Sequence, residues 1–222
     1  MKQIAIDGPA GAGKSTIAKF LSKELNLMYV DTGAMYRSIG LACINAGIDM
    51  ENEAQVGEVC GKADIDIQYI DGVQHMFLEG KDVSTDIRRE EVGKAASDTS
   101  RFTAVRERLV AIQQQLGERY DVVMDGRDIG TKVLPDAGLK IFLTASSACR
   151  ADRRVKQLAE QGITADFEEV KRDIEQRDYN DSHRANSPLC QAEDAILVDT
   201  SDLNIEQVIA VIKDLYNKTV WK

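Results

Sequence analysis

The stretch IDGPAGAGKST, residues Ile6–Thr16, constrains the fold of this 222-residue chain more than any other segment. Its core, Gly8–Ser15, fits the pattern G-x-x-x-x-G-K-[ST] in a run of glycine, proline and alanine. Residues this small let successive backbone N–H groups turn toward one ligand and surround an anion. The pattern has this meaning only where a strand precedes it and a helix follows, so the flanking segments decide its interpretation.

Both flanks of the glycine loop meet that condition. Gln3–Asp7 (QIAID) is a short apolar run of the kind that forms a buried strand. After the loop, Ile17, Leu21 and Leu25 recur at helical spacing. The segment therefore predicts a P-loop that binds a nucleoside triphosphate. A glycine-rich turn without a ligand is the alternative, and the strand and helix around the loop make it the weaker one.

Each part of the loop has an expected role. The backbone amides and the positive N-terminal end of the following helix bind phosphates. Lys14 bridges the β- and γ-phosphates, Ser15 binds Mg²⁺, and Thr16 reaches the α-phosphate. The predicted nucleotide-binding residues are Gly8, Pro9, Ala10, Gly11, Ala12, Gly13, Lys14, Ser15 and Thr16.

The rest of the chain alternates between apolar runs and segments with helical periodicity. Further strands are expected at Leu27–Asp31, Tyr120–Asp125, Leu139–Ala145 and Ala195–Thr200. Helices are expected at 34–47, 102–116, about 147–161, about 166–185 and 204–216. Strands that alternate with helices predict an α/β fold, with a parallel sheet covered by helices on both faces.

One segment departs from this alternation. Ile65–Val83 has a period of two around Asp71-Gly72, which is a strong signal for a β-hairpin. An antiparallel element inside an α/β pattern predicts an inserted lobe.

Composition narrows the classes of protein that fit. A hydrophobic content of 43% suits one sizeable α/β domain, or a core with an inserted subdomain. The formal net charge of −9 argues against a general nucleic-acid binder. It leaves room for a small anionic ligand held by a local cluster of arginines. The chain has no 18-residue apolar run and its first residues, MKQIAIDG, turn polar too quickly for a signal peptide, so we expect neither a membrane span nor a leader.

The cysteines and histidines carry no recognisable metal pattern. Cys43, Cys60, Cys149 and Cys190 form no CxxC pair, and the chain has two histidines. The sequence therefore predicts no zinc site. Scattered cysteines of this kind are expected to be reduced, buried thiols, as in a cytosolic protein.

Three classes of P-loop protein remain to be separated. A switch GTPase needs a guanine-binding motif of the N-K-x-D type, which this chain lacks, and a large ATPase needs a longer chain. A small kinase needs a second anion-binding site with arginines around the transferred group.

In MDGRD, Asp125 is predicted to face Mg²⁺, directly or through water, and Arg127 to hold an acceptor phosphate. A simple tight turn at Asp125-Gly126 is the alternative.

Two later segments add arginines. RADRRVKQ, residues 150–157, brings Arg154 and its neighbours to the start of a helix, where a solvated face is as good an interpretation as anion binding. Arg177, Asp181 and Arg184 fall at i, i+4 and i+7 on one helical face. We favour a ligand-facing stripe over an ion-pair ladder, because a cation placed N-terminal to its acid stabilises a helix poorly.

Six segments in this order resemble the bacterial cytidylate kinases, a family of nucleoside monophosphate kinases. The segments are IDGPAGAGKST, DTGAMYR (31–37), LEGKDVSTDIR (78–88), DGRDIGT (125–131), KIFLTAS (140–146) and RDYNDSHR (177–184). The resemblance runs nearly end to end. It implies a P-loop NTPase-type parallel five-stranded sheet in a single domain, 1–222. An inserted monophosphate-binding lobe at about 32–100 and a mobile lid at about 150–170 are part of that fold.

The resemblance also implies an activity. It is the transfer of the ATP γ-phosphoryl group to CMP or dCMP, with Mg²⁺ as cofactor, by a cytoplasmic monomer that binds no nucleic acid and no membrane. A P-loop kinase for another nucleotide or metabolite is one alternative, and a nucleotide-responsive binding protein without transfer activity is another.

The resemblance assigns roles to individual residues. Around the acceptor phosphate it implies Thr32, Arg37, Arg127 and Arg184; for the base Ser97, Arg106 and Asp128; and for the sugar Arg177 and Asp181. The implied catalytic set is Lys14, Asp125, Arg127, Arg154 and Arg184, with Ser15 and Asp125 at the metal. Periodicity alone does not choose Arg106 over Arg108, because both flank the apolar stripe of their helix equally.

Overall fold

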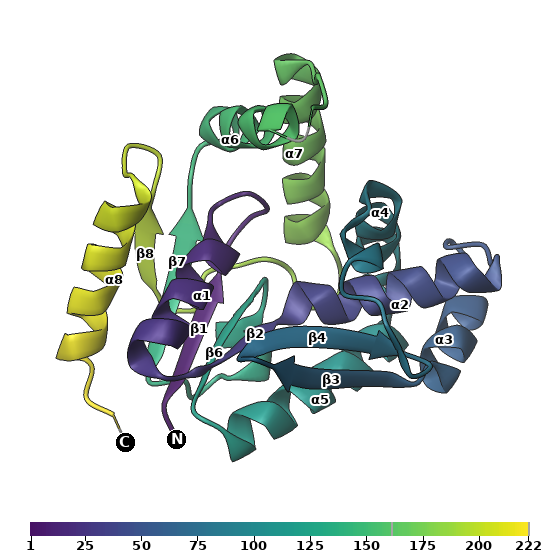
Figure 1. Cartoon of the computed structure of the whole chain (residues 1–222), viewed down its shortest axis with the longest axis horizontal. Helices are drawn as coiled ribbons and strands as arrows, with labels where there is room; N and C mark the ends of the chain where they lie inside the picture. Colours follow the sequence, from purple (N-terminus) through teal and green to yellow (C-terminus); the bar gives the residue numbers. More distant parts are fainter. Residues whose placement is uncertain (161, 222) are drawn as a thin grey trace.

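The computed structural model describes residues 1–160 and 162–221 (Figure 1). Position 161, which the predicted helix at 147–161 and the predicted lid include, and position 222 lie outside this description. The centre is a five-stranded sheet in the order β2-β6-β1-β7-β8, and every pairing in it is parallel. Its strands are β1 (Gln3–Asp7), β2 (Met28–Asp31), β6 (Val122–Gly126), β7 (Leu139–Thr144) and β8 (Ile196–Asp199). The predicted α/β sheet is confirmed.

Helices cover both faces of this sheet, as predicted. One face packs against α1 (Lys14–Leu25) and α8 (Ile205–Lys218), whose apolar residues share a core with Ile4 and Ile141. The other face packs against α2 (Thr32–Ala46) and α5 (Thr103–Arg119), with Ala5 and Met124 at the centre. Burial on both faces explains why the strands are continuous apolar runs rather than alternating ones.

The predicted hairpin is confirmed. Strands β3 (Ile65–Ile70), β4 (Val73–Leu78) and β5 (Lys81–Asp82) form a separate antiparallel sheet. At the turn, Asp71 has φ 52° and Gly72 φ 75°, the two positive values that a type I′ turn requires. Buried side chains of β4 belong to the same core as the central sheet, so the lobe has no core of its own.

Four short elements were not predicted. They are α3 (Glu53–Lys62), α4 (Glu90–Thr99), the 3₁₀ turn η1 (Asp86–Arg88) and the π-helical turn η2 (Ile129–Val133). Of the two helices, α3 buries only two residues and α4 buries mainly small ones. Neither therefore has the stripe of large apolar side chains that identifies a helix in a sequence.

The last two helices before β8 are α6 (Ser147–Glu160) and α7 (Phe167–His183), which project from the sheet beyond its carboxyl edge (Figure 1). The helix predicted at about 166–185 is confirmed, but the placement of Arg184 on its face is wrong, because the helix ends at His183. Arg184 has ψ 143°, an extended conformation, because the chain turns back and the N–H of Leu189 donates to the carbonyl of Asp181. Arg184 therefore reaches its site from the segment after the helix. None of the helices described is long and apolar enough to cross a bilayer.

The cysteine prediction holds in part. All four are free, and Cys43 and Cys60 are buried. Cys149 is partly exposed and Cys190 fully exposed, so the expectation of buried thiols is wrong for these two. Cys190 lies in the irregular segment between α7 and β8, and such connections run over the surface.

The crossing of α2 and α4 gives a stability prediction. A Cβ added to Gly40 of α2 would lie 2.8 Å from the backbone nitrogen of Ala96 in α4. We expect Gly40→Ala to lower the free energy of unfolding by about 1–3 kcal/mol, since the backbone contact must open. Urea unfolding measures the change.

Gly93→Ala is the matched control, because Gly93 lies within α4 and has no atom within 4 Å of the added Cβ. It is expected to stabilise by about 0.5–1 kcal/mol, the usual gain for alanine in a helix. Equal effects of the two substitutions would contradict the prediction.

Candidate active site

The carboxyl ends of the parallel strands lie along one edge of the sheet. Strand register places Asp31 of β2 opposite Asp125 of β6, and Asp7 of β1 opposite Gly126. The P-loop leaves β1 at this edge, between the residues that follow β6 and β7. Open α/β sheets bind their ligands at the carboxyl edge, where the loops of neighbouring strands diverge.

The P-loop needs glycine for two different reasons. Gly8, Gly11 and Gly13 all have positive φ, at 143°, 76° and 95°. In addition, a Cβ on Gly8 would lie 1.9 Å from the carbonyl oxygen of Leu143 in β7. The loop therefore passes directly against the backbone of the neighbouring strand.

The loop separates two cavities. The main cleft is lined on the loop side by Ala10, Gly11, Lys14 and Ser15. The second cavity lies against Ala12, Gly13 and Thr16. Gly8 and Pro9 line neither of them, although the Pro9 carbonyl accepts a hydrogen bond from Lys14.

Lys14 is a buried cation. Only 6% of it is exposed, and its Nζ donates to the Pro9 carbonyl at 2.7 Å. Burial and the nearby charge of Arg127 lower the pKa of Lys14 to about 7. A buried ammonium is costly unless an anion compensates it, so Lys14 is placed to meet a negatively charged ligand.

Ser15 and Asp125 form the oxygen-rich part of the cleft. The Ser15 hydroxyl donates to Asp125 Oδ2 at 2.8 Å, and the Tyr29 hydroxyl donates to Oδ1 at 2.9 Å. Burial and then the charge of Asp31 raise the pKa of Asp125. One carboxylate and one hydroxyl beside a phosphate-binding loop are the hard oxygen donors that suit Mg²⁺, so these residues fit the ion.

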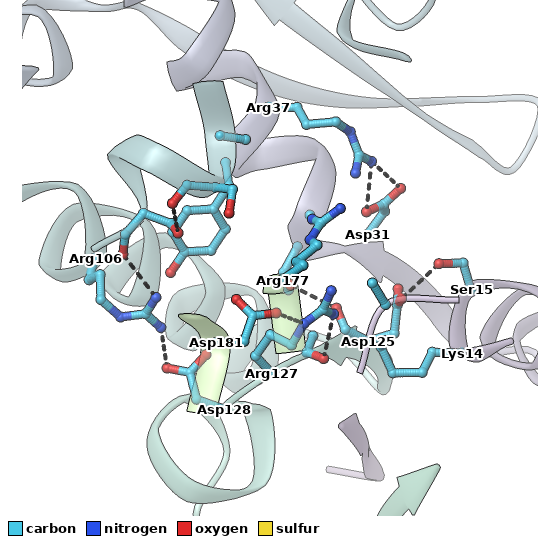
Figure 2. A pocket seen from close by; sticks show the side chains of 18 of the residues that line it. Lys14, Ser15, Asp31, Arg37, Arg106, Asp125, Arg127, Asp128, Arg177 and Asp181 are labelled. Carbon is cyan, nitrogen blue, oxygen red and sulfur yellow. Dashed lines mark hydrogen bonds and ion pairs between the residues drawn. The ribbon is translucent and has the colours of Figure 1, made fainter. Parts of the chain in front are cut away.

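The main cleft has a local surplus of positive charge. Six cationic side chains and four carboxylates line it, a surplus of two in a chain whose net charge is −9. Figure 2 shows Lys14, Ser15 and Asp125 at one end of the cleft and Arg106 with Asp128 at the other. The cations are Lys14, Arg37, Arg106, Arg127, Arg177 and Arg184; the carboxylates are Asp31, Asp125, Asp128 and Asp181.

Asp31 organises one wall of the cleft. Its carboxylate caps α2 through the N–H of Ala34 and pairs with Arg37 at 3.2 Å and Arg88 at 2.9 Å. Burial raises the pKa of Asp31, but the two arginines outweigh that effect, so the net pKa is lowered. Next to it, the Thr32 hydroxyl donates to the Asp125 carbonyl at 2.7 Å.

Asp128 organises the far end of the cleft. Arg106 donates to its carboxylate, and Arg184 lies 3.9 Å from the same group. Both Arg106 and Asp128 are less than 5% exposed. Arg108, which the sequence did not separate from Arg106, instead donates to the carbonyls of Cys60 and Ala63 and lines neither cavity.

Between the two ends lie Arg127 and Asp181 (Figure 2). Arg127 Nε donates to Asp181 Oδ2 at 2.8 Å. Burial lowers the pKa of Arg127, but Asp181 outweighs this effect and raises it. Arg177 also lines the cleft and has no hydrogen-bond or ion-pair partner among the described residues.

The cleft contains buried polar atoms that lack partners. Four of the six such atoms found in the described residues belong to its lining. A buried donor without a partner costs about 1–3 kcal/mol, so a cluster of them is kept for a ligand. The four atoms are Tyr36 Oη, Arg37 Nε, Arg106 Nε and Arg184 Nη2.

Most of the predicted site residues come together here. The cleft is lined by Thr32, Arg37, Ser97, Arg106, Asp125, Arg127, Asp128, Arg177, Asp181 and Arg184, together with Lys14 and Ser15. Three predicted site residues line neither cavity: Gly8, Pro9 and Arg154. Arg154 Nη1 instead donates to Gln157 Oε1, one turn further along α6, at 3.1 Å.

Asp7 is a site residue that the sequence analysis missed. Its buried carboxylate accepts hydrogen bonds from the N–H groups of Ile129 at 2.8 Å and Gly130 at 2.7 Å. Burial raises its pKa to about 6. Asp7 thereby fastens the start of η2, and with it Asp128, to β1. A charged residue at the end of a buried strand was the available signal.

The second cavity lies on the other side of the P-loop. Its volume is about 660 Å³, within the usual range for small-molecule sites. Thr16, Arg153 and Asn204 line it, and Arg153 is held by the Thr200 carbonyl at 2.7 Å. Of the residues that line it, only Ala12, Gly13 and Thr16 of the P-loop were predicted to bind nucleotide.

Comparison with known proteins gives one consistent family. The sequence profile described as cytidylate kinase matches residues 4–218. The cytidylate kinase of Caldicellulosiruptor saccharolyticus is 49% identical over 217 residues, 98% of this chain and 96% of that protein. That of Enterococcus faecalis is 50% identical over 212 residues, 96% and 94% of the two chains. A shikimate kinase structure from Bacteroides thetaiotaomicron matches 97% of this chain and 98% of its own, with a TM-score of 0.51; at 14% identity this likeness shows the fold alone.

The pairing of Asp31 predicts a pH-dependent loss of stability. Asp31→Asn keeps a good helix cap but leaves Arg37 and Arg88 without their carboxylate. At pH 7 we expect the free energy of unfolding to fall by about 3 kcal/mol. Because the folded-state pKa of Asp31 is lowered, the difference is complete above the unfolded-state pKa of about 3.9 and disappears as the pH falls through the folded-state pKa.

Urea unfolding of both proteins between pH 7 and pH 3 checks this. Asp86→Asn is the control. Within residues 1–160 and 162–221, Asp86 forms an ion pair only with Lys81, at 4.0 Å on the surface, so this substitution should cost less than about 1 kcal/mol. A difference for Asp31→Asn that grows as the pH falls would contradict the prediction.

Proposed function

The chain belongs to the cytidylate kinase family, and we propose that its main cleft and P-loop transfer the γ-phosphoryl group of ATP to CMP or dCMP. One observation carries this proposal. A P-loop with its lysine lies at one end of the cleft, a buried arginine–aspartate pair with unpartnered donors lies at the other, and Arg127 lies between them. A protein that only binds a nucleotide as a switch needs the P-loop, but it needs neither the buried arginine–aspartate pair nor Arg127.

The donor side follows from the loop. The triphosphate lies along the P-loop amides, with Lys14 at the β- and γ-phosphates. Thr16 borders the second cavity, so we assign that cavity to the nucleoside of ATP, with Arg153 and Asn204 at its wall. Ser15 and Asp125 hold Mg²⁺, which neutralises phosphate charge when bound.

The choice of Mg²⁺ agrees with the donor groups present. In residues 1–160 and 162–221, no three His, Cys, Asp or Glu side chains gather as a metal site. Mg²⁺ takes one or two protein oxygens and completes its shell with phosphates and water. The single carboxylate of Asp125 and the hydroxyl of Ser15 match that requirement.

On the acceptor side, the base is recognised by Ser97, Arg106 and Asp128. Cytosine presents an amine at C4 and acceptors at N3 and O2, which complement a carboxylate and a guanidinium. Uracil reverses the groups at positions 4 and 3, so the same buried pair would face the wrong partners. Unpaired buried polar groups discriminate by up to about 10⁴–10⁵.

The phosphate of CMP occupies the middle of the cleft. It is surrounded by Thr32, Arg37, Arg127 and Arg184. The sugar is held by Arg177 and Asp181. The unpartnered Nε of Arg37 and Nη2 of Arg184 supply hydrogen bonds that the protein itself does not use. These groups keep the acceptor oxygen close to the γ-phosphate.

Catalysis requires positioning and charge neutralisation rather than a strong base. An ionised oxygen of the CMP phosphate attacks the γ-phosphorus in line; the new O–P bond forms as the bond to the β-phosphate oxygen breaks, and ADP leaves. Lys14 and Arg127 stabilise the charge that spreads over the transferred group, and an arginine in this role contributes about 10³–10⁵ in rate.

Residues 1–222 act as one domain, in which residues about 32–100 form the monophosphate-binding lobe and about 150–170 a lid. Lid closure over both substrates would exclude water and suppress hydrolysis of ATP. It would also bring Arg154 toward the phosphates from its present partly exposed position on α6. A monomeric state and a cytoplasmic location stay predictions from the sequence.

An acceptor screen tests the function directly. ADP formation is measured with CMP, dCMP, UMP, AMP, GMP and shikimate, each added with ATP and Mg²⁺. We expect CMP and dCMP to be used best and Lys14→Ala to lose transfer while remaining folded by circular dichroism. Preference for another acceptor would replace the substrate assignment, and ADP formation that ignores the acceptor would exclude a kinase.

The buried Asp128 gives a prediction on specificity. Asp128→Asn should lower kcat/KM for CMP by about 10²-fold or more, because a charged partner of Arg106 and of the base amine is lost. The KM for ATP should change little. Asp136→Asn, at an exposed position nearby in the chain, is the control. Equal losses for CMP and ATP would remove Asp128 from base recognition.

A further inference from the structure

Arg150 of α6 is a buried arginine that has no assigned role in substrate binding. It is 4% exposed and lines neither cavity. Its three nitrogens each have a protein partner: Nε donates to the Ala145 carbonyl at 2.8 Å, Nη1 to the Ala10 carbonyl at 3.1 Å, and Nη2 to Asp178 Oδ2 at 2.6 Å. The three partners belong to the segment after β7, to the P-loop and to α7. One guanidinium thus connects three separate parts of the site.

The side chain also packs directly on the P-loop. A Cβ built on Gly11 would lie 3.4 Å from Cβ and 3.6 Å from Cγ of Arg150. Gly11 and Ala10 are the loop residues that face the main cleft beside Lys14. Arg150 therefore cannot move without displacing the part of the loop that is assigned to hold the donor phosphates.

The third partner ties this contact to the acceptor side. Asp178 lies on α7 next to Arg177 and one turn before Asp181, and both of those residues line the acceptor part of the cleft. Asp178 Oδ1 is buried without a partner, and Arg150 is the one cation paired with this carboxylate in the described part of the chain. Asp178 of α7 is therefore connected to the P-loop through the guanidinium group of Arg150.

We propose that Arg150 and Asp178 are positioning residues that set the distance between the two substrates. Through Arg177 and Asp181, α7 holds the acceptor; through Asp178 and Arg150, the same helix fixes the Ala10 carbonyl and hence the donor loop. Neither residue touches a reacting atom. The inference rests on the proposed transfer reaction, and it adds that one helix aligns both reactants for in-line attack.

Asp178→Asn tests the proposal with little change of shape. We expect kcat for CMP phosphorylation to fall by about 10- to 100-fold, because a shift of about 1 Å in reacting groups has that effect. The KM for CMP should change less than about twofold, since the acceptor's own contacts remain. Hydrolysis of ATP without CMP should fall less than transfer, because water needs no alignment by α7. The ratio of hydrolysis to transfer should therefore rise.

Glu175→Gln is the matched control. Glu175 also joins α7 to α6, by accepting a hydrogen bond from the Ser147 hydroxyl at 2.8 Å, but it does not reach the P-loop. It should leave both rates near those of the wild type. Transfer by the wild-type enzyme in the same assay separates failure of the proposed reaction from failure of this inference.

A second variant covers the case in which Asp178→Asn loses stability. Arg150→Lys keeps the charge but replaces three fixed nitrogens with one, so it should raise the same ratio. Adding Asp178→Asn to Arg150→Lys should change the ratio little further, since the two residues act as one unit. The proposal is overturned if the ratio stays at the wild-type value in either variant, or if the two effects add independently.

Discussion

The arrangement of the site depends on carboxylates that lie between arginine side chains and hold them close together. Five arginines and a lysine around one cleft repel one another, and burial makes that repulsion stronger. Asp31 lies between Arg37 and Arg88, and Asp181 lies between Arg127 and Arg184. These pairs hold the guanidinium groups in fixed directions before any ligand binds. They leave selected buried donors without a protein partner, as a site for an anionic ligand requires.

The fold supplies this arrangement by placing strand ends in register. Because β1, β2 and β6 are parallel neighbours, the P-loop, Asp31 and Asp125 lie along one edge of the sheet. The inserted lobe shares its core with that sheet, so Asp31 and Arg37 are anchored to the same sheet that carries the P-loop. The helices α6 and α7 project from it and contact the loop through Arg150.

Much of the fold and of the candidate site could be predicted from the sequence. The P-loop, the five parallel strands and the Asp71-Gly72 hairpin have strong local signals, and each was confirmed. Short elements such as α3 and α4 lack a stripe of large apolar residues, so periodicity missed them. Arg184 was expected on the face of α7, but the chain turns back just after the helix, where the N–H of Leu189 donates to the carbonyl of Asp181. Helical periodicity does not show where such a turn begins.

The sequence by itself was enough to predict a nucleoside triphosphate site at Lys14 and Ser15, since that signal is local: small residues, a cation and a hydroxyl at fixed spacing between a strand and a helix. The tertiary structure decided what helical periodicity left open, namely which of two neighbouring arginines lines the cleft. Arg106 and Arg108 are equivalent along their helix, yet one meets Asp128 in the cleft and the other meets backbone carbonyls outside it. A guanidinium is fixed by partners that come from distant parts of the chain, and no local pattern records those partners.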